Sequence, residues 1–263
     1  MVKIHNVKAT KSSQRFHQKW NSHSQNNNAR KLTFKQNKMK ITFYGHASLG
    51  IEVNGKFILV DPYISANPKA TIININELKA DYILLTHAHQ DHVLDVEYIA
   101  SRTDATIVSN YEIASHFGNK GLKFHPMNHG GSWNFDFGKL KYVSAIHSSS
   151  FADGSYGGNP GGFVIEGEHK NIYISGDTAL TMDMKLIPMR TKLDLAIFPI
   201  GNNFTMDVED AILASDFVEC DKILGVHYDT FGYIEINHED AIRNFFDKGK
   251  DLMLLSIGES IQL

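Results

Sequence analysis

The stretch DYILLTHAHQDH, residues 81–92, joins a short apolar run to a dense group of polar side chains. Its first half is rich in strand-forming residues, which indicates a buried β-strand. Its second half places four side chains that can bind metals within six residues: His87, His89, Asp91 and His92. Zinc, manganese and iron all accept imidazole and carboxylate ligands. The stretch therefore predicts a strand that ends in a metal-binding loop.

The spacing of these histidines separates this loop from a helical metal site. A zinc-binding helix of the HExxH type places its histidines four apart, with Glu after the first. Here His87 and His89 are two apart, and His92 follows three residues later. Such spacing at a strand end lets one loop serve two neighbouring metals. An ordinary polar surface loop is the alternative, but histidines seldom crowd so closely without a ligand role.

The motif His-x-His-x-Asp-His, following a strand that ends in Thr86, resembles the signature of the metallo-β-lactamase superfamily. Three further residues follow predicted strands in the family's order: His147, Asp177 and His227. The similarity is greatest to the family's metal-dependent hydrolase branch, near the ascorbate-6-phosphate lactonase-like group. The segments FYGHAS (residues 43–48) and PIGNNFTM (residues 199–206) support this resemblance. It covers residues 39–263, so Met39 is a candidate first residue.

The resemblance implies a fold and a set of ligands. The fold is the four-layer αβ/βα sandwich, an α/β structure with two facing mixed sheets and helices outside. One metal site would consist of His87, His89 and His147, and a second of Asp91, His92 and His227. Asp177 would bridge the two sites. Taken alone, each of the last three strand-end residues could also be an ordinary loop, turn or core residue.

The implied activity is that of a metal-dependent hydrolase. Two divalent ions, zinc or manganese, would share a hydroxide that attacks a small-molecule ester, lactone or phosphoester. Asp91 is the predicted catalytic residue, because as ligand and hydrogen-bond acceptor it would orient the nucleophile and carry its proton to the leaving group. A nuclease or phosphodiesterase of the same fold is one alternative. A diiron oxidoreductase is another, although Gln90 stands where such proteins carry Glu.

Residues near the predicted ligands have less definite roles. Asp61, at the end of the strand 58–60, is expected to brace the metal loop through hydrogen bonds. His46 is expected either to contact substrate or to make a structural hydrogen bond. The glycine-rich loop 148–162 is a candidate substrate loop or a plain surface connection. Candidate cavity residues are Asn203, Phe204 and Thr205, with Tyr228 and Thr230 as weaker candidates.

Composition indicates one large folded domain with a distinct N-terminal segment. The 263 residues are 42% hydrophobic, and no apolar run approaches a membrane span. Residues 1–38 hold nine Lys and Arg and no acidic residue, which predicts a disordered basic tail. The remaining domain, 39–263, holds 17 basic and 29 acidic residues, a net charge of −12. The acidic domain disfavours nucleic acid and anionic membranes as partners and favours a small-molecule substrate.

The single cysteine, Cys220, excludes an internal disulfide framework and fits a reducing, cytoplasmic location. Assembly into a homo-oligomer stays open. Apolar patterns predict alternating strands and helices after an initial hairpin at Asn54-Gly55. The predicted helices are 76–79, 94–101, 111–117, 182–189, 208–218 and 239–247. The predicted strands are 40–44, 49–53, 56–60, 82–85, 106–109, 122–125, 132–135, 140–147, 163–166, 171–175, 195–200, 222–226 and 252–257.

Overall fold

The computed structural model describes residues 38–263, so the predicted tail lies outside the described residues except for Lys38. The described chain begins with a three-stranded antiparallel meander, β1 (Lys40–Gly45), β2 (Ser48–Val53) and β3 (Lys56–Val60). Asn54 and Gly55 join the last two strands with φ angles of 51° and 76°. Both positive values match a type I′ turn, which Asn-Gly favours. The hairpin predicted from the sequence is present.

Two mixed sheets of seven strands each form within residues 38–263. The first has the order β14-β1-β2-β3-β4-β5-β6, in which β4, β5 and β6 extend β3 in parallel. The second has the order β13-β12-β11-β10-β9-β8-β7, with β10 to β13 parallel. The remaining strands of the first sheet are β4 (Tyr82–Leu84), β5 (Thr106–Asn110), β6 (Phe124–Met127) and β14 (Ser260–Gln262). Those of the second are β7 (Ser132–Phe135), β8 (Gly138–Ser144), β9 (Gly161–Glu166), β10 (Asn171–Ile174), β11 (Leu195–Pro199), β12 (Lys222–Val226) and β13 (Asp251–Met253).

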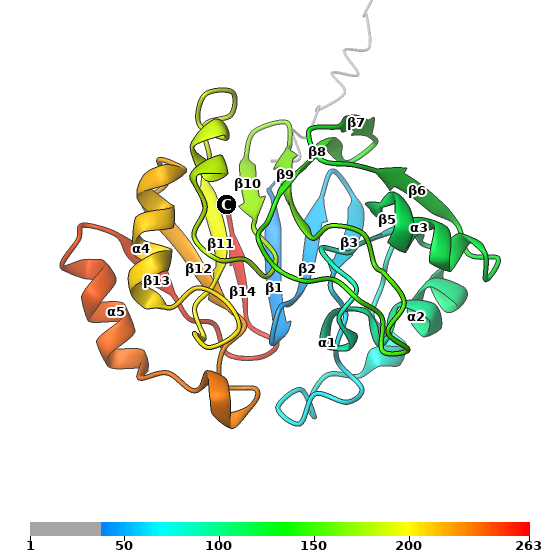
Figure 1. Ribbon diagram of the computed structural model, residues 1–263, viewed down its shortest axis with the longest axis horizontal. Coiled ribbons are helices and arrows are strands. Elements are labelled where there is room, and N and C mark those ends of the chain that lie inside the picture. Colours follow the sequence, from blue (N-terminus) through cyan, green and yellow to red (C-terminus); the bar gives the residue numbers. More distant parts are fainter. Residues whose placement is uncertain (1–37) are drawn as a thin grey trace, which may run out of the picture. The chain divides into compact units, whose positions relative to one another are not determined.

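Helices cover the outer faces of both sheets (Figure 1). The first sheet carries α1 (Gln90–Val93), α2 (Val96–Thr103) and α3 (Tyr111–Gly118), and the second carries α4 (Val208–Phe217) and α5 (His238–Phe246). Between the sheets lies an apolar core that joins Ile41 and Ile58 of the first to Phe163 and Leu195 of the second. Burial of each such side chain contributes about 1.5–3 kcal/mol. The predicted αβ/βα sandwich is confirmed.

Several element boundaries differ from the prediction. The expected helix 94–101 is α2, which begins two residues later, and the unpredicted helix α1 precedes it. Between the two helices, the Asp95 carboxylate accepts the backbone N–H groups of Ile64 and Ser65. The expected helices near residues 76 and 182 are 3₁₀ segments, η1 (Ile75–Glu77) and η2 (Met182–Leu186). A third such segment is η3 (Gly232–Ile234). β13 ends at Met253, and the unpredicted β14 crosses to pair with β1.

Strand direction fixes where the candidate site forms. In the first sheet β1, β3 and β4 run the same way, and in the second β8, β10 and β12 do. Every candidate ligand follows the carboxyl end of one of these strands.

No helix among the described residues is long and apolar enough to span a membrane.

Candidate metal centre

The structure brings all seven predicted ligands to one place. His87, His89, Asp91 and His92 lie on the loop after β4 and the first turn of α1, while the other three follow β8, β10 and β12. One group, in which ligand atoms lie within 4.8 Å of one another, contains His87, His89 and His147. A second contains Asp91, His92 and His227, joined by His46. These are the two triads that the sequence predicted as metal sites.

Asp177 lies between the two triads. Its Oδ2 atom is 3.9 Å from His87 Nε2 and 3.7 Å from His147 Nε2 in the first triad. The same atom is 3.4 Å from His92 Nε2 and 3.0 Å from His227 Nε2 in the second. One carboxylate oxygen thus faces both groups, as a bridging ligand would.

Asp61 and Thr86 orient two of the imidazoles. Asp61 Oδ2 accepts hydrogen bonds from the Thr86 hydroxyl, at 2.6 Å, and from His92 Nδ1, at 2.9 Å. Its Oδ1 accepts the Thr86 backbone N–H at 2.8 Å. Thr86 Oγ1 also lies 3.0 Å from His87 Nδ1. With protons on these two Nδ1 atoms, the Nε2 atoms of His87 and His92 keep free lone pairs. Asp61 therefore makes the bracing contacts expected from the sequence.

His46 is buried and contacts a ligand instead of the cavity. Its Nε2 lies 3.0 Å from Asp91 Oδ2, and its Nδ1 lies 2.9 Å from the Thr230 hydroxyl. Burial and the charge of His227 lower the pKa of His46 to about 4, so the ring is neutral at pH 7. Nε2–H then donates to Asp91, and Nδ1 accepts from Thr230. The structure thus selects the structural hydrogen bond from the two roles predicted for His46.

The residues present fit a bound metal. Within residues 38–263, the buried atoms without a hydrogen-bond partner include His92 Nε2, Asp177 Oδ1 and His227 Nδ1. Nitrogen and oxygen atoms buried in this way cost stability unless something pairs with them. His87 Nε2 and His89 Nδ1 also lie 3.0 Å apart, close enough to bind one ion together. A divalent cation would pair with His92 Nε2, His87 Nε2 and His89 Nδ1, whereas His227 and Asp177 face the site with Nε2 and Oδ2 and not with their unpaired atoms.

Charge within the cluster leads to the same conclusion. Burial lowers the pKa of His87 well below its ordinary value, which keeps that ring neutral. Burial also opposes charge on His92, but Asp177 and Asp61 outweigh it and raise the pKa of His92 well above its ordinary value. Asp177 in turn stays ionised, because His227 and His92 lower its pKa despite burial. The carboxylates thus require positive charge between them, which a metal can supply in place of a proton.

The backbone is strained where these loops meet. His46, Asp61 and His227 have φ angles of 56°, 44° and 55°, in the left-handed region that non-glycine residues seldom occupy. His227 N–H also donates to His46 O at 2.8 Å, which ties the loop after β12 to the loop after β1. Strained residues of this kind concentrate at functional sites, where the surrounding structure holds them in place.

The loop 148–162 supports the metal-binding loop. Ser149 Oγ accepts the backbone N–H of Ala88 at 3.1 Å, and Gly161 N–H donates to Thr86 O at 3.0 Å. A Cβ atom on Gly157 would lie only 2.2 Å from the Ala88 side chain, so only glycine fits there. Of this loop, Ser148 reaches the cavity, and its hydroxyl lies 3.2 Å from His89 Nε2. The loop thus braces the metal-binding loop at Ser149, Gly157 and Gly161 and lines the cavity with Ser148.

A cavity of about 570 Å³ opens above the candidate ligands. Among the residues proposed from the sequence, Phe204 lines it, whereas Asn203, Thr205, Tyr228 and Thr230 are not among its lining residues. Phe231 and Tyr233, which follow His227 and also line the cavity, were not predicted from the sequence. Three aromatic residues in the eight that begin at His227 were the available signal.

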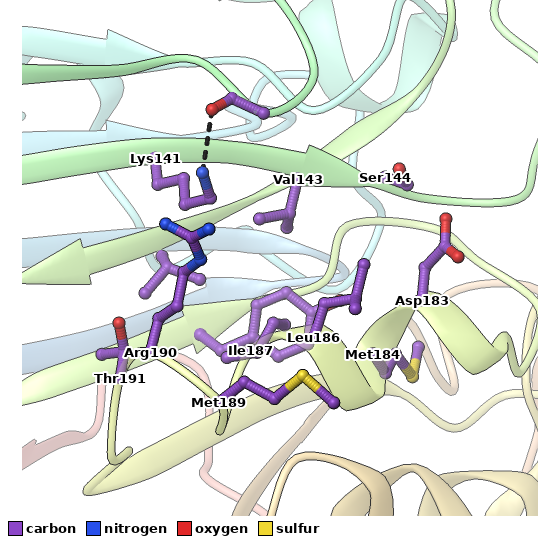
Figure 2. A pocket seen from close by; sticks show the side chains of 13 residues that line it. Lys141, Val143, Ser144, Asp183, Met184, Leu186, Ile187, Met189, Arg190 and Thr191 are labelled. Carbon is purple, nitrogen blue, oxygen red and sulfur yellow. Dashed lines mark hydrogen bonds between the residues drawn. The ribbon is translucent and has the colours of Figure 1, made fainter.

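A second cavity, of about 460 Å³, lies on the outer face of the second sheet beside η2. Figure 2 shows Met184, Ile187 and Met189 along it, with Lys141 hydrogen-bonded to a backbone carbonyl. No candidate ligand is among the described residues that line it. The chemistry therefore belongs to the cavity above the histidines.

Comparison with known proteins agrees with this geometry. The model of the β-lactamase superfamily domain matches residues 56–228. A UPF0173 metal-dependent hydrolase of Flavobacterium johnsoniae is 80% identical over 225 residues, which are 86% of this chain and all of the relative. A protein with the same description in Christiangramia forsetii is 70% identical over 226 residues, with the same two coverages.

Solved structures show the same fold. Igni18, a metallo hydrolase from Ignicoccus hospitalis, aligns with a TM-score of 0.78 at 30% identity, covering 86% of this chain and 98% of its own. An isothiocyanate hydrolase from Delia radicum gut bacteria aligns with a TM-score of 0.69 at 20% identity, covering 85% and 98%. At that identity the second likeness concerns the fold alone.

Proposed function

The chain belongs to the UPF0173 metal-dependent hydrolases of the β-lactamase superfamily, and from that premise we propose that it cleaves a small-molecule ester, lactone or phosphoester with two divalent metal ions. The observation that carries the dinuclear proposal is Asp177 Oδ2, which lies within 3.9 Å of Nε2 atoms from both triads. Zinc and manganese are the proposed metals, and both accept the nitrogen and oxygen ligand atoms present.

The proposed ligand assignment follows the two groups. One ion would be bound by three histidines, His87, His89 and His147. The other ion would be bound by Asp91, His92 and His227. The Asp177 carboxylate would bind both ions. When bound, such ions polarise the substrate oxygen and make water a nucleophile near neutral pH. The rest of the mechanism depends on the chain's own residues, of which Asp91 lines the cavity beside the proposed ions.

Asp91 is suited to guide the proton of the attacking water. Its side chain is 30% exposed and lines the cavity, while its Oδ2 is held by His46 Nε2–H at 3.0 Å. Burial alone would raise the pKa of Asp91, but the hydrogen bond from His46 and the charge of His92 hold it below the ordinary value. The carboxylate is therefore ionised, and it can accept a proton and pass it to the leaving group.

The remaining proposals concern the location of the enzyme in the cell, its partners and the alternative diiron activity. We propose a cytoplasmic enzyme with a small-molecule substrate and with neither nucleic acid nor membrane as partner, supported by the buried free thiol of Cys220 and the acidic domain. Homo-oligomer formation stays open. No observation favours the diiron alternative, since Gln90 is exposed and is not among the described residues lining the cavity.

Replacing one ligand tests the proposal. His89→Ala should leave a folded protein that binds less metal and has lost turnover, because His89 contributes an atom to the first triad and is only partly buried. His169→Ala is the matched control, since His169 is exposed and lies outside both groups. Elemental analysis, circular dichroism and hydrolysis of 4-nitrophenyl esters measure the three properties. Full activity in the His89 variant would contradict the proposal.

A further inference from the structure

The cavity above the candidate ligands has two kinds of wall. Its floor consists of the histidines and of Asp91 and Asp177, and its outer wall consists of Phe204, Phe231 and Tyr233. Phe204 lies on the loop after β11, and the other two lie at η3, beyond His227. The rings of Phe204 and Tyr233 meet edge to face, with centroids 6.3 Å apart and planes at 76°. Aromatic side chains from two separate loops thus face the candidate metals.

These aromatic side chains are poorly covered by the rest of the described chain. Phe204 is 53% exposed and Tyr233 is 77% exposed. Exposure of a single aromatic residue is common and needs no explanation. Here, however, the rings line one concave site next to a set of ligands, and such sites combine apolar walls with a few polar groups. The wall is therefore suited to a substrate with an aromatic or bulky apolar part.

The cavity lacks the cationic side chains that an anionic substrate would need. Phosphate sites use Arg or Lys to pair with the anionic oxygens. Among the described residues that line this cavity none is Lys or Arg, and the charged ones are two carboxylates. The net charge of −12 on residues 39–263 adds to the repulsion of anions. Beyond the metals, the described residues lining the site offer no cationic side chain to a second negative charge.

We propose that the enzyme acts on an uncharged carboxylic ester or lactone whose aromatic or branched apolar group lies against Phe204 and Tyr233. This inference rests on the proposed function and narrows its substrate class. In the reaction, the oxygen of water bonds to the carbonyl carbon and the acyl C–O bond breaks. One proton of the water ends on the leaving alcohol and the other is released, which leaves a carboxylate.

Esters that differ only in the acyl group test the substrate class. The metal-loaded full chain is assayed with 4-nitrophenyl phenylacetate, 4-nitrophenyl acetate and the anionic 4-nitrophenyl hemisuccinate, which share one leaving group. We expect kcat/KM for the phenylacetate to exceed that for the hemisuccinate by about tenfold or more. Phe204→Ala and Tyr233→Ala should each raise KM for the phenylacetate about tenfold, and KM for the small acetate ester by a smaller factor.

Binding of a ligand that cannot be hydrolysed gives a second readout. In saturation-transfer NMR, the ring protons of 4-phenyl-2-butanone should receive saturation from the metal-loaded wild type and lose it in the double variant Phe204→Ala/Tyr233→Ala. Phe246→Ala and Tyr111→Ala are matched controls, because both side chains are exposed and neither lines the cavity. Neither control should change binding or KM.

The outcomes separate this inference from the proposed function. A hemisuccinate ester cleaved as well as the phenylacetate, or ketone binding unchanged in the double variant, overturns the apolar substrate class while the hydrolase stands. A metal-loaded protein that binds the ketone through the two rings but cleaves none of the esters overturns the proposed function. Tyr233→Arg adds a further check, since a cation in the wall should shift kcat/KM toward the hemisuccinate.

Discussion

Asp61→Asn should weaken metal binding without altering any predicted ligand. Asp61 is 1% exposed and accepts hydrogen bonds from Thr86 N–H, the Thr86 hydroxyl and His92 Nδ1–H. Asn is nearly the same size and tolerates the φ of 44° at this position. Its carbonyl oxygen can keep the bond to Thr86 N–H, but its NH₂ group then faces the other two atoms. His92 must move its proton to Nε2, and the lone pair meant for the metal is lost.

The expected size of the effect follows from the hydrogen bond of His92 Nδ1–H, which the NH₂ group in the Asp61→Asn variant could not accept. Each hydrogen bond to a charged group contributes about 1.5–3 kcal/mol, and removal of such an outer partner commonly lowers metal affinity about 10- to 100-fold. A tenfold change corresponds to about 1.4 kcal/mol, so a 10- to 100-fold loss is about 1.4–2.8 kcal/mol, which agrees with the loss of this one bond. We expect affinity for one of the two ions to fall by about 10- to 100-fold.

Calorimetric titration of metal into the chelated protein measures this change, with a chelator competing when binding is tight. Asp104→Asn is the matched control, because Asp104 also has a positive φ, of 61°, but is exposed and lies outside the described ligand groups. If the Asp61→Asn variant bound each of the two ions as tightly as the wild type does, the proposed orientation of His92 by Asp61 would be refuted.

Two other changes probe the surroundings of the site, and a third probes ion pairs elsewhere on the second sheet. His46→Asn removes the N–H that holds Asp91 and should lower metal affinity about 10-fold, by the same titration. Gly157→Ala places a Cβ 2.2 Å from Ala88, so the free energy of unfolding should fall by about 1–3 kcal/mol in denaturant titrations. Lys250→Met removes the ion pairs with the carboxylates of α4 and the turn after it, and it should cost about 1 kcal/mol at pH 7. Burial opposes the charge on Lys250, but these carboxylates raise its pKa above 10.5, so its contribution is present below that pH and is lost as pH rises through the folded value. A stability difference that instead grew above pH 10.5 would contradict this assignment.

The sequence was most informative for candidate ligands that lie close together in the chain or directly after a predicted strand. The cluster from His87 to His92 is local, so its role could be predicted from spacing and from the apolar run before it. His147, Asp177 and His227 could be placed because each follows a predicted strand in the family's order. The fold followed from the alternation of strands and helices.

Features that depend on distant contacts could not be predicted in the same way. The role of His46 depends on Thr230, 184 residues away in the chain. The aromatic wall depends on which loops meet above the ligands, and the apolar pattern does not show where Phe231 and Tyr233 point. β14 is three residues long, too short to show an alternating pattern, and exists because β1 offers it an edge. These features arise from packing between segments instead of from local sequence.

The central claim, a dinuclear metal site, is tested most directly by the metal content of the protein. Full-length protein is purified without chelator or nickel resin, saturated with zinc or manganese, freed of excess ion and analysed for metal per chain. We expect about two ions per chain in the wild type and fewer in His89→Ala. A saturated wild-type chain that holds one ion or none would contradict the claim.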